Sequence, residues 1–206
     1  MTVRPRATWF CVDIECSGPV PALYDCLSIG AVVVRHGPGG APTIGESLYL
    51  ELAPAAGRVD PGAMAVNKLD LGRLAREGLG RRDALGRLTA FVEAALQAES
   101  SVGSKPVFVG HNAPFDWSFV SYAYHAEGLP NPFGYKALDT KALAMGVLGV
   151  HWFDTNKETL EVALGLPPQD PTQVHRADYD AMFQAGILVG LLSRMPSAGD
   201  PAPRAG

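Results

Sequence analysis

The chain has few cysteines, no long apolar run and no excess of basic charge. Its cysteines, Cys11, Cys16 and Cys26, lack the Cys-x-x-Cys spacing of structural zinc sites, so we expect reduced thiols. No uninterrupted apolar segment approaches the roughly 18 residues of a membrane span, and the first residues do not resemble a signal-peptide core. We therefore expect a soluble, cytoplasmic protein without a membrane partner.

The charge balance excludes a global basic surface. Lys and Arg number 17 against 21 Asp and Glu, which gives a formal net charge of −4. Any nucleic acid must therefore be held locally and with the help of metal ions. Several acidic residues lie inside apolar segments rather than in polar runs. This pattern indicates that some of these carboxylates bind a cation.

The length of 206 residues, 47% of them apolar, suits one domain with a sizeable core. We expect this domain to cover residues 1–195, and the Pro/Gly/Ala-rich segment 196–206 to be a disordered tail. Runs of β-branched and aromatic residues between Gly and Pro predict three strands near the N-terminus. These strands are expected at 8–15, 27–35 and 44–51, with a hairpin connection at 37–42.

Helical spacing then alternates with short strand patterns. Helices are expected around 64–77, 83–98, 114–127, 139–145, 157–164 and 177–193, with a strand at 106–110 and a short one ending at Leu138. Three successive strands followed by alternating strand and helix predict an α/β fold. Its mixed central sheet should have about five strands, the first three antiparallel, flanked by helices.

The first candidate site lies at the end of the first predicted strand. Residues two apart on a strand face the same side, so Asp13 and Glu15 project together while Val12 points into the opposite layer. Two adjacent carboxylates are costly unless a cation joins them, and Mg²⁺ or Mn²⁺ suits carboxylate oxygens. For this short pattern alone, a solvent-facing pair is the alternative.

The second candidate site runs from a strand end into a helix, over residues 110–116. Asp116 shares a helix face with Phe119 and Val120, and this face is expected to pack on the sheet. A carboxylate there needs a partner. Alternatively, Asp116 interacts with the helix dipole, Asn112 bonds the backbone of the turn, and His111 has a structural role.

The third candidate site precedes and opens the last predicted helix. Asp180 shares a helix face with Gln184 and Ile187, so it is also aimed inward. Five helical residues rotate by about 140°, so His175 cannot lie on that face and is expected in the preceding loop, within reach of the site. Asp178 is interpreted as a helix cap or a first-turn charge rather than as a ligand. An isolated loop histidine would otherwise be a surface residue.

Together these segments resemble the DEDD-type 3′-5′ exonucleases with a catalytic histidine, a DnaQ-like group of the RNase H-like superfamily that includes RNase T and proofreading exonucleases. The resemblance runs from Phe10 to about Leu192. It rests on Asp13-x-Glu15 followed by Ser17-Gly18, on His111-Asn112-x-x-Phe115-Asp116, and on His175-x-Ala177-x-x-Asp180.

The resemblance implies an RNase H-like fold and a two-metal site that uses Mg²⁺ or Mn²⁺. Asp13 would bridge both ions, Glu15 and Asp180 would complete the nucleophile-side ion, and Asp116 would support the other. His175 would act as the general base. The implied partner is the 3′ end of single-stranded DNA or RNA, and the implied product is a nucleoside 5′-monophosphate.

Substrate contacts are expected near the same motifs. Met64, Leu69 and Phe115 are candidates for an apolar surface under the terminal base, although each is also a plausible core residue. Ser17 and Gly18 are candidates for contacts to the 3′-hydroxyl, and Asn112 is a further candidate. The sequence Cys16-Ser17-Gly18 departs from the Thr-Gly that relatives often carry there, which leaves those contacts open.

Two other functions remain as alternatives at this point. One is a non-catalytic RNase H-like module that binds nucleic acid or a polymerase, and the other is a metal-dependent nucleotidase. The short segment after Leu192 offers no polymerase-binding domain, so a polymerase partner is not indicated. The sequence leaves a homodimer open.

Overall fold

The structure is a computed structural model, and it describes residues 6–37, 40–55, 57–98 and 103–195. The predicted tail at 196–206 lies outside the described residues, and the single domain expected for residues 1–195 stays a prediction. Five strands form one sheet in the order β3-β2-β1-β4-β5. They are β1 (Ala7–Cys16), β2 (Cys26–His36), β3 (Pro42–Glu51), β4 (Lys105–Gly110) and β5 (Ala137–Asp139).

The sheet is mixed, as the sequence predicts. β1 pairs with β2, and β2 with β3, in antiparallel fashion. β1 and β4, and then β4 and β5, are parallel. The antiparallel half follows from short connections, whereas the parallel half requires helical crossovers between its strands.

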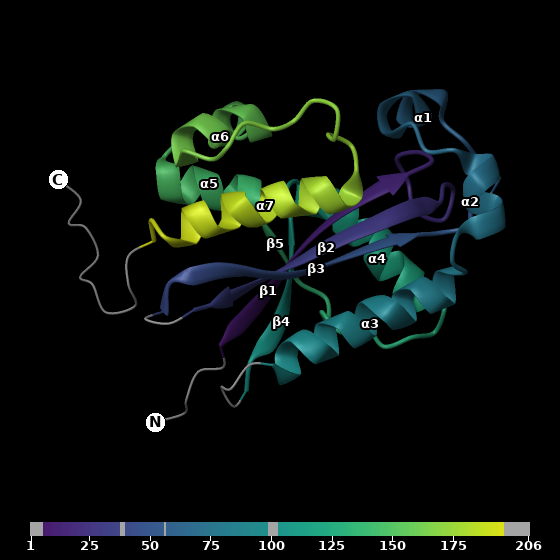
Figure 1. Cartoon of the computed structure of the whole chain (residues 1–206), viewed down its shortest axis with the longest axis horizontal. Coiled ribbons are helices and arrows are strands. Elements are labelled where there is room, and N and C mark those ends of the chain that lie inside the picture. Colours follow the sequence, from purple (N-terminus) through teal and green to yellow (C-terminus); the bar gives the residue numbers. More distant parts are fainter. Residues whose placement is uncertain (1–5, 38–39, 56, 99–102, 196–206) are drawn as a thin grey trace.

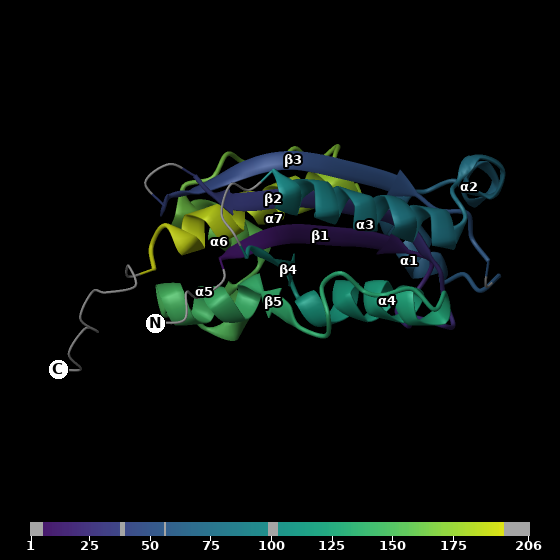
Figure 2. The same cartoon turned by 90° about the horizontal axis from the view of Figure 1, so that it is seen from below.

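Helices cover both faces of this sheet and one of its ends (Figures 1 and 2). They are α1 (Pro61–Asn67), α2 (Leu71–Glu77), α3 (Arg81–Gln97), α4 (Ala113–Ala126), α5 (Thr140–Leu148), α6 (Lys157–Leu164) and α7 (Ala177–Leu192), with a 3₁₀ turn η2 (Trp152–Asp154). Figure 1 shows α1 and α2 beyond the carboxyl end of β1, and α5, α6 and α7 grouped together.

One predicted helix needs correction. The segment around 64–77 is two short helices, α1 and α2, because the chain turns between them. Lys68 adopts a left-handed backbone with φ of 58° and ends α1. Asp70 then caps α2, where its carboxylate accepts the N–H of Arg73 at 3.0 Å.

The alternation along β1 separates two cores, as expected for a strand covered on both faces. Val12 and Ile14 belong to the core that α3 and α4 form with the sheet. Cys11, one residue away, packs in the second core with Ala181 and Leu188 of α7. Odd-numbered residues of β1 therefore face α7, and this is the side on which Asp13 and Glu15 are found.

The state of the three cysteines agrees with the sequence analysis. Cys11, Cys16 and Cys26 are free thiols. Burial raises the pKa of Cys16 to about 11, so this thiol stays protonated at neutral pH. In the described part of the chain, no helix has the length and apolarity to traverse a bilayer.

Candidate active site

The first and second candidate segments meet where β1 and β4 separate. The pairing of these strands ends at Cys11 and Val109, so the N–H of Ile14 finds no partner on β4. Asp116, in the first turn of α4, accepts that N–H through Oδ1 at 3.1 Å. The end of β1 is therefore held to α4, and Asp116 is buried beside it.

The fourth carboxylate, Asp180, reaches the site because α7 begins against the sheet. Gly30 of β2 pairs with Asp13 of β1. A Cβ atom on Gly30 would overlap the carbonyl of Ala177, the first residue of α7. Because Gly30 has no side chain, the start of α7 can pack against the backbone of β2. The first turn of α7 then places Asp180 near Asp13.

His175 lies outside α7, as the helical rotation predicts. It is exposed and has a left-handed backbone with φ of 67°. Its backbone N–H donates to Asp180 Oδ2 at 2.8 Å. The potential ligand atoms of Glu15, His175 and Asp180 all lie within 4.8 Å of one another. The loop is therefore tied to the helix start, while the imidazole stays accessible beside two carboxylates.

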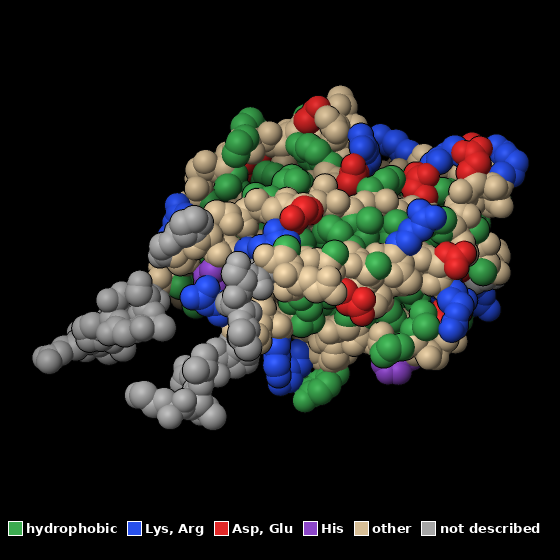
Figure 3. All heavy atoms as spheres, turned by 60° about the horizontal axis from the view of Figure 1, so that its bottom comes forward, with side chains coloured by type: hydrophobic (Ala, Val, Ile, Leu, Met, Phe, Trp, Pro, Cys, Tyr) green, Lys and Arg blue, Asp and Glu red, His purple; other side chains and the backbone are tan. Residues whose placement is uncertain are grey.

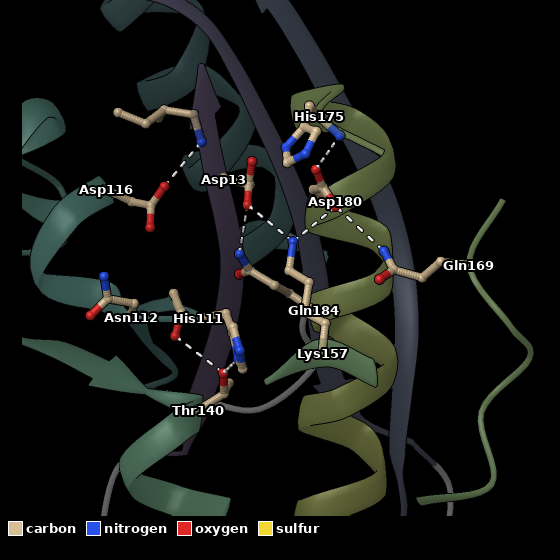
Figure 4. Close-up of polar contacts among 12 residues, drawn as sticks. Asp13, His111, Asn112, Asp116, Thr140, Lys157, Gln169, His175, Asp180 and Gln184 are labelled. Carbon is tan, nitrogen blue, oxygen red and sulfur yellow. Dashed lines mark hydrogen bonds and ion pairs between the residues drawn. The ribbon is translucent and has the colours of Figure 1, made fainter. Parts of the chain in front are cut away.

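Two further side chains, which the sequence analysis did not select, complete this cluster (Figure 4). Lys157 Nζ lies 2.8 Å from Asp180 Oδ1 and 3.7 Å from Asp13 Oδ1. Gln184, one turn after Asp180 on α7, donates to Asp13 Oδ1 at 3.0 Å. A polar residue on an otherwise apolar helix face could have indicated Gln184 as a site residue. Lys157 is the first residue of an ordinary helix, and no sequence pattern indicated its role.

Burial raises the pKa of three of these carboxyl groups. It raises the pKa of Asp13 to about 7, and the nearby Asp180 adds to this against the opposing effect of Lys157. Burial followed by the Asp13 charge raises the pKa of Glu15 to about 9. The pKa of Asp116 is raised well above its ordinary value for the same two reasons.

Lys157 responds in the opposite sense. Burial by itself would lower its pKa, but the carboxylates of Asp13 and Asp180 outweigh this and hold the pKa above its ordinary value. The lysine is therefore a cation. This ammonium ion pairs with Asp13 and Asp180, so ionisation of all four carboxyl groups would leave a deficit of positive charge in the site.

This donor set fits a divalent cation. It consists mainly of buried carboxylate oxygens, the ligands that Mg²⁺ and Mn²⁺ prefer. Three potential ligand groups already lie close together. Since the raised pKa values of Asp13 and Glu15 come from uncompensated negative charge and burial, a dication at this place would stabilise the ionised forms.

His111 has a different environment from His175. Its Nδ1 lies 2.8 Å from the hydroxyl of Thr140, which in turn donates to the Gly110 carbonyl at 3.3 Å. Burial, followed by the charges of Lys157 and Lys141, lowers the pKa of His111 to about 3. His111 is thus neutral at physiological pH and joins the end of β4 to α5, which matches the structural alternative.

Ser17 and Gly18, the candidates for contacts to the 3′-hydroxyl, are engaged in contacts within the protein. The hydroxyl of Ser17 donates to the Arg58 carbonyl at 3.0 Å and accepts the Asp25 N–H at 2.9 Å. Gly18 is buried against Tyr24, whose ring a Cβ atom there would overlap. Their role in substrate binding stays a prediction, and the structure explains both residue types by local packing.

The other predicted substrate residues flank the carboxyl end of β1. Buried Asn67 donates to the Cys16 carbonyl at 3.0 Å and accepts the Leu69 N–H at 3.0 Å. It thereby fastens the segment of Met64 and Leu69, both half-buried, to the end of β1.

Phe115 and Asn112 lie at the start of α4. Phe115 is half-buried, and its ring centroid is 5.4 Å from that of Phe119. Asn112 is exposed and has a left-handed backbone, and its N–H donates to Asp139 Oδ1 at 3.0 Å. Figure 4 shows Asn112 on the same side of β1 as Asp116. Both substrate roles stay predictions.

One face of the molecule shows how its charges are distributed. On the face shown in Figure 3, basic and acidic side chains are interspersed over the described residues, without a continuous basic band. This face therefore offers no broad positive field to a nucleic acid.

Two kinds of protein are similar to this chain over most of their sequence. The 3′-5′ DNA exonuclease Cap18 of Escherichia coli is 37% identical over 177 residues, which cover 86% of this chain and 87% of that protein. Ribonuclease T of Yersinia enterocolitica is 31% identical over 196 residues, which cover 93% of this chain and 88% of that protein. No protein-family model matches the chain.

Solved structures share the fold at low sequence identity. A 3′-exonuclease described in 3′-end recognition of a histone mRNA stem-loop aligns with a TM-score of 0.74 and 12% identity, covering 93% of this chain and 84% of that one. The nuclease domain of 3′hExo, described as a DEDDh family member bound to rAMP, aligns with a TM-score of 0.70 and 12% identity, covering 91% of each chain. These likenesses confirm the predicted RNase H-like fold.

Proposed function

The chain belongs to the DnaQ-like family of 3′-5′ exonucleases, and on this premise we propose that it removes nucleotides from the 3′ end of single-stranded DNA. The observation that carries the proposal is the gathering of Asp13, Glu15, Asp116 and Asp180 at one end of the sheet, with His175 beside them. The products would be a nucleoside 5′-monophosphate and a strand shorter by one residue.

The four carboxylates are the proposed metal ligands. Asp13, Glu15 and Asp180 would hold one Mg²⁺ or Mn²⁺ ion, and Asp13 with Asp116 would hold a second. The chemistry that such ions supply is Lewis-acid stabilisation of the negative charge that develops on the phosphoryl group. In the protein itself, Gln184 fixes Asp13 and the N–H of His175 fixes Asp180, so two ligands are oriented by hydrogen bonds.

His175 is the proposed general base. Its imidazole would accept a proton from the water that attacks the terminal phosphorus. The bond that breaks joins this phosphorus to the 3′-oxygen of the penultimate nucleotide, and that oxygen stays with the shortened strand. Because His175 is exposed and its backbone N–H, not its ring, is bonded to Asp180, its ring has room to serve each incoming water.

Sequence similarity supports DNA as the substrate. The relative with 37% identity is named as a DNA exonuclease, whereas the ribonuclease T cited above is 31% identical. A single strand is proposed because the terminal phosphodiester must reach carboxylates that are largely buried, and its base must leave any helical stack. Met64, Leu69 and Phe115 are the proposed contacts for that base, with Ser17, Gly18 and Asn112 near the sugar.

The proposal is tested by degradation of oligonucleotides labelled at the 5′ end. Single-stranded DNA with a free 3′ end should shorten in Mg²⁺ or Mn²⁺, while a strand with a blocked 3′ end should persist. RNA of the same sequence should be degraded more slowly. Faster cleavage of RNA would overturn the choice of DNA, and release of phosphate from mononucleotides without shortening of strands would favour the nucleotidase.

A further inference from the structure

Lys157 occupies a position that is unusual for a lysine. It is the first residue of α6, and its side chain is only 21% exposed. Its ammonium group lies between Asp13 and Asp180, which come from the centre of the sheet and from α7 (Figure 4). These are two of the residues proposed above as metal ligands.

We propose that Lys157 is a positioning residue that neutralises Asp13 and Asp180 in the metal-free protein and must withdraw when a divalent ion binds them. This inference rests on the proposed metal dependence but not on the identity of the nucleic acid. It assigns to α6 a function beyond packing: its first side chain controls how tightly the site binds metal.

The contacts of the two aspartates support this role. The Oδ1 atom of each aspartate faces Lys157. The Oδ2 atom of Asp180 accepts the N–H of His175, and Gln184 donates to Asp13. Nitrogen donors thus orient both carboxylates before any metal is present. Among the described residues, Lys157 is the cation that pairs with both aspartates. Its loss would leave two largely buried carboxylates facing each other without an ion pair, which disfavours the folded state.

Lys157 and a divalent ion would compete for the same carboxylate oxygens. A cation at 2.8 Å from Asp180 Oδ1 takes an oxygen that a divalent ion would coordinate. An ammonium ion and a dication on the same oxygens repel each other, and this repulsion is large at partly buried sites. The lysine therefore lowers the affinity for metal while it holds the ligands in place.

The lysine is also built to move. Its charge sits at the end of a flexible four-carbon stem. The helix start below it is fixed independently, because Asn156 caps α6 by accepting the Thr159 N–H at 2.8 Å. Withdrawal of the ammonium group therefore requires rotation of one side chain and no shift of α6.

Lys141 provides a matched control. It is a second lysine near this end of the sheet, but its Nζ lies 4.9 Å from the Trp152 ring centroid and 3.5 Å from the Thr155 carbonyl. It makes no ion pair with a carboxylate among the described residues. Lys141→Met removes the same charge and a similar side chain without touching Asp13 or Asp180.

The test is calorimetric titration of the full chain with Mn²⁺, together with thermal unfolding in EDTA. Lys157→Met should bind Mn²⁺ on the order of tenfold more tightly than the wild type, and should unfold at a lower temperature when metal-free. Lys157→Arg keeps the charge and should retain the weaker affinity, and Lys141→Met should match the wild type. If Lys157→Met does not fold, Lys157→Gln takes its place.

The outcomes separate the two proposals. Unchanged or weaker Mn²⁺ binding by Lys157→Met, in a wild type that binds Mn²⁺, overturns the role of Lys157 and leaves the exonuclease proposal standing. An increase in affinity that Lys157→Arg and Lys141→Met share also overturns it. A wild type that binds no Mn²⁺ overturns the metal dependence itself and this inference with it.

Discussion

At the scale of single residues, His175 and the carboxylates differ in how the chain holds them. Asp116 and Asp180 are buried and fixed by backbone N–H groups, whereas the imidazole of His175 is exposed in a loop. Mutation of His175 can therefore separate proton transfer from metal binding, because loss of the imidazole leaves the carboxylates intact.

We therefore expect His175→Ala to lose about 10²–10⁴-fold in the rate of strand shortening, the usual contribution of a general base. Mn²⁺ binding by this variant should stay within a few-fold of the wild type. Single-turnover degradation and calorimetry measure the two effects. A comparable loss of Mn²⁺ affinity would show that His175 is a ligand instead.

The raised pKa of Glu15 predicts how the metal-free protein responds to pH. Its pKa is about 9 in the folded state against an ordinary value of 4.5, so the folded state binds the proton more tightly. This contribution to stability is fully present below about pH 4.5 and is lost as pH rises toward 9. The melting temperature in EDTA should therefore fall between pH 5 and pH 9.

Glu15→Gln should reduce this slope and should melt at a higher temperature than the wild type at pH 8. Glu93→Gln, an exposed substitution on α3, serves as the control and should retain the slope of the wild type. Melting curves across this pH range decide the matter, and a wild-type melting temperature that is level from pH 5 to pH 9 would contradict the assignment.

At the scale of elements, the site depends on the close approach of α7 to β2. The backbone of Ala177 lies where a side chain on Gly30 would be, so α7 can begin there only if that position is glycine. Asp180 is three residues further along the same helix, and its distance from Asp13 is set by this contact.

Gly30→Ala should destabilise the protein by about 1–3 kcal/mol, the usual cost of overpacking. It should also reduce activity by up to about 10²-fold, because a displacement of about 1 Å in a catalytic group has this effect. Gly146→Ala in α5 is the matched control, since open space surrounds that position. It should be neutral or stabilising by about 0.5–1 kcal/mol. Equal behaviour of the two variants would refute the role of Gly30.

At the scale of the whole molecule, metal binding should appear as stability. A ligand that binds only the folded state adds about 2.7 kcal/mol at 100 times its dissociation constant. Mn²⁺ should therefore raise the melting temperature, and EDTA should reverse both this rise and the activity. The rise should vanish in Asp13→Asn and persist in Asp83→Asn, an exposed change at the start of α3. A rise that survives Asp13→Asn would place the metal elsewhere.

The sequence alone was sufficient for the parts of this protein that obey short-range rules. Strand alternation put Asp13 and Glu15 on one face of β1, and helical spacing put Asp180 inward and His175 in a loop. The mixed sheet with three antiparallel strands followed from the order of patterns. The break between α1 and α2 was missed, because it depends on a left-handed backbone at Lys68 that no periodicity reveals.

Only the tertiary structure decided which groups meet. The Asp116 carboxylate caps the N–H of Ile14 across 102 residues, and Gln184 reaches Asp13 across 171. The close approach at Gly30 and the position of Lys157 between two aspartates also depend on how α6 and α7 pack on the sheet. A local pattern shows which groups a residue can offer. Hydrogen bonds and close ion pairs form only within about 3–4 Å, so the packing of distant segments decides which partners each group meets.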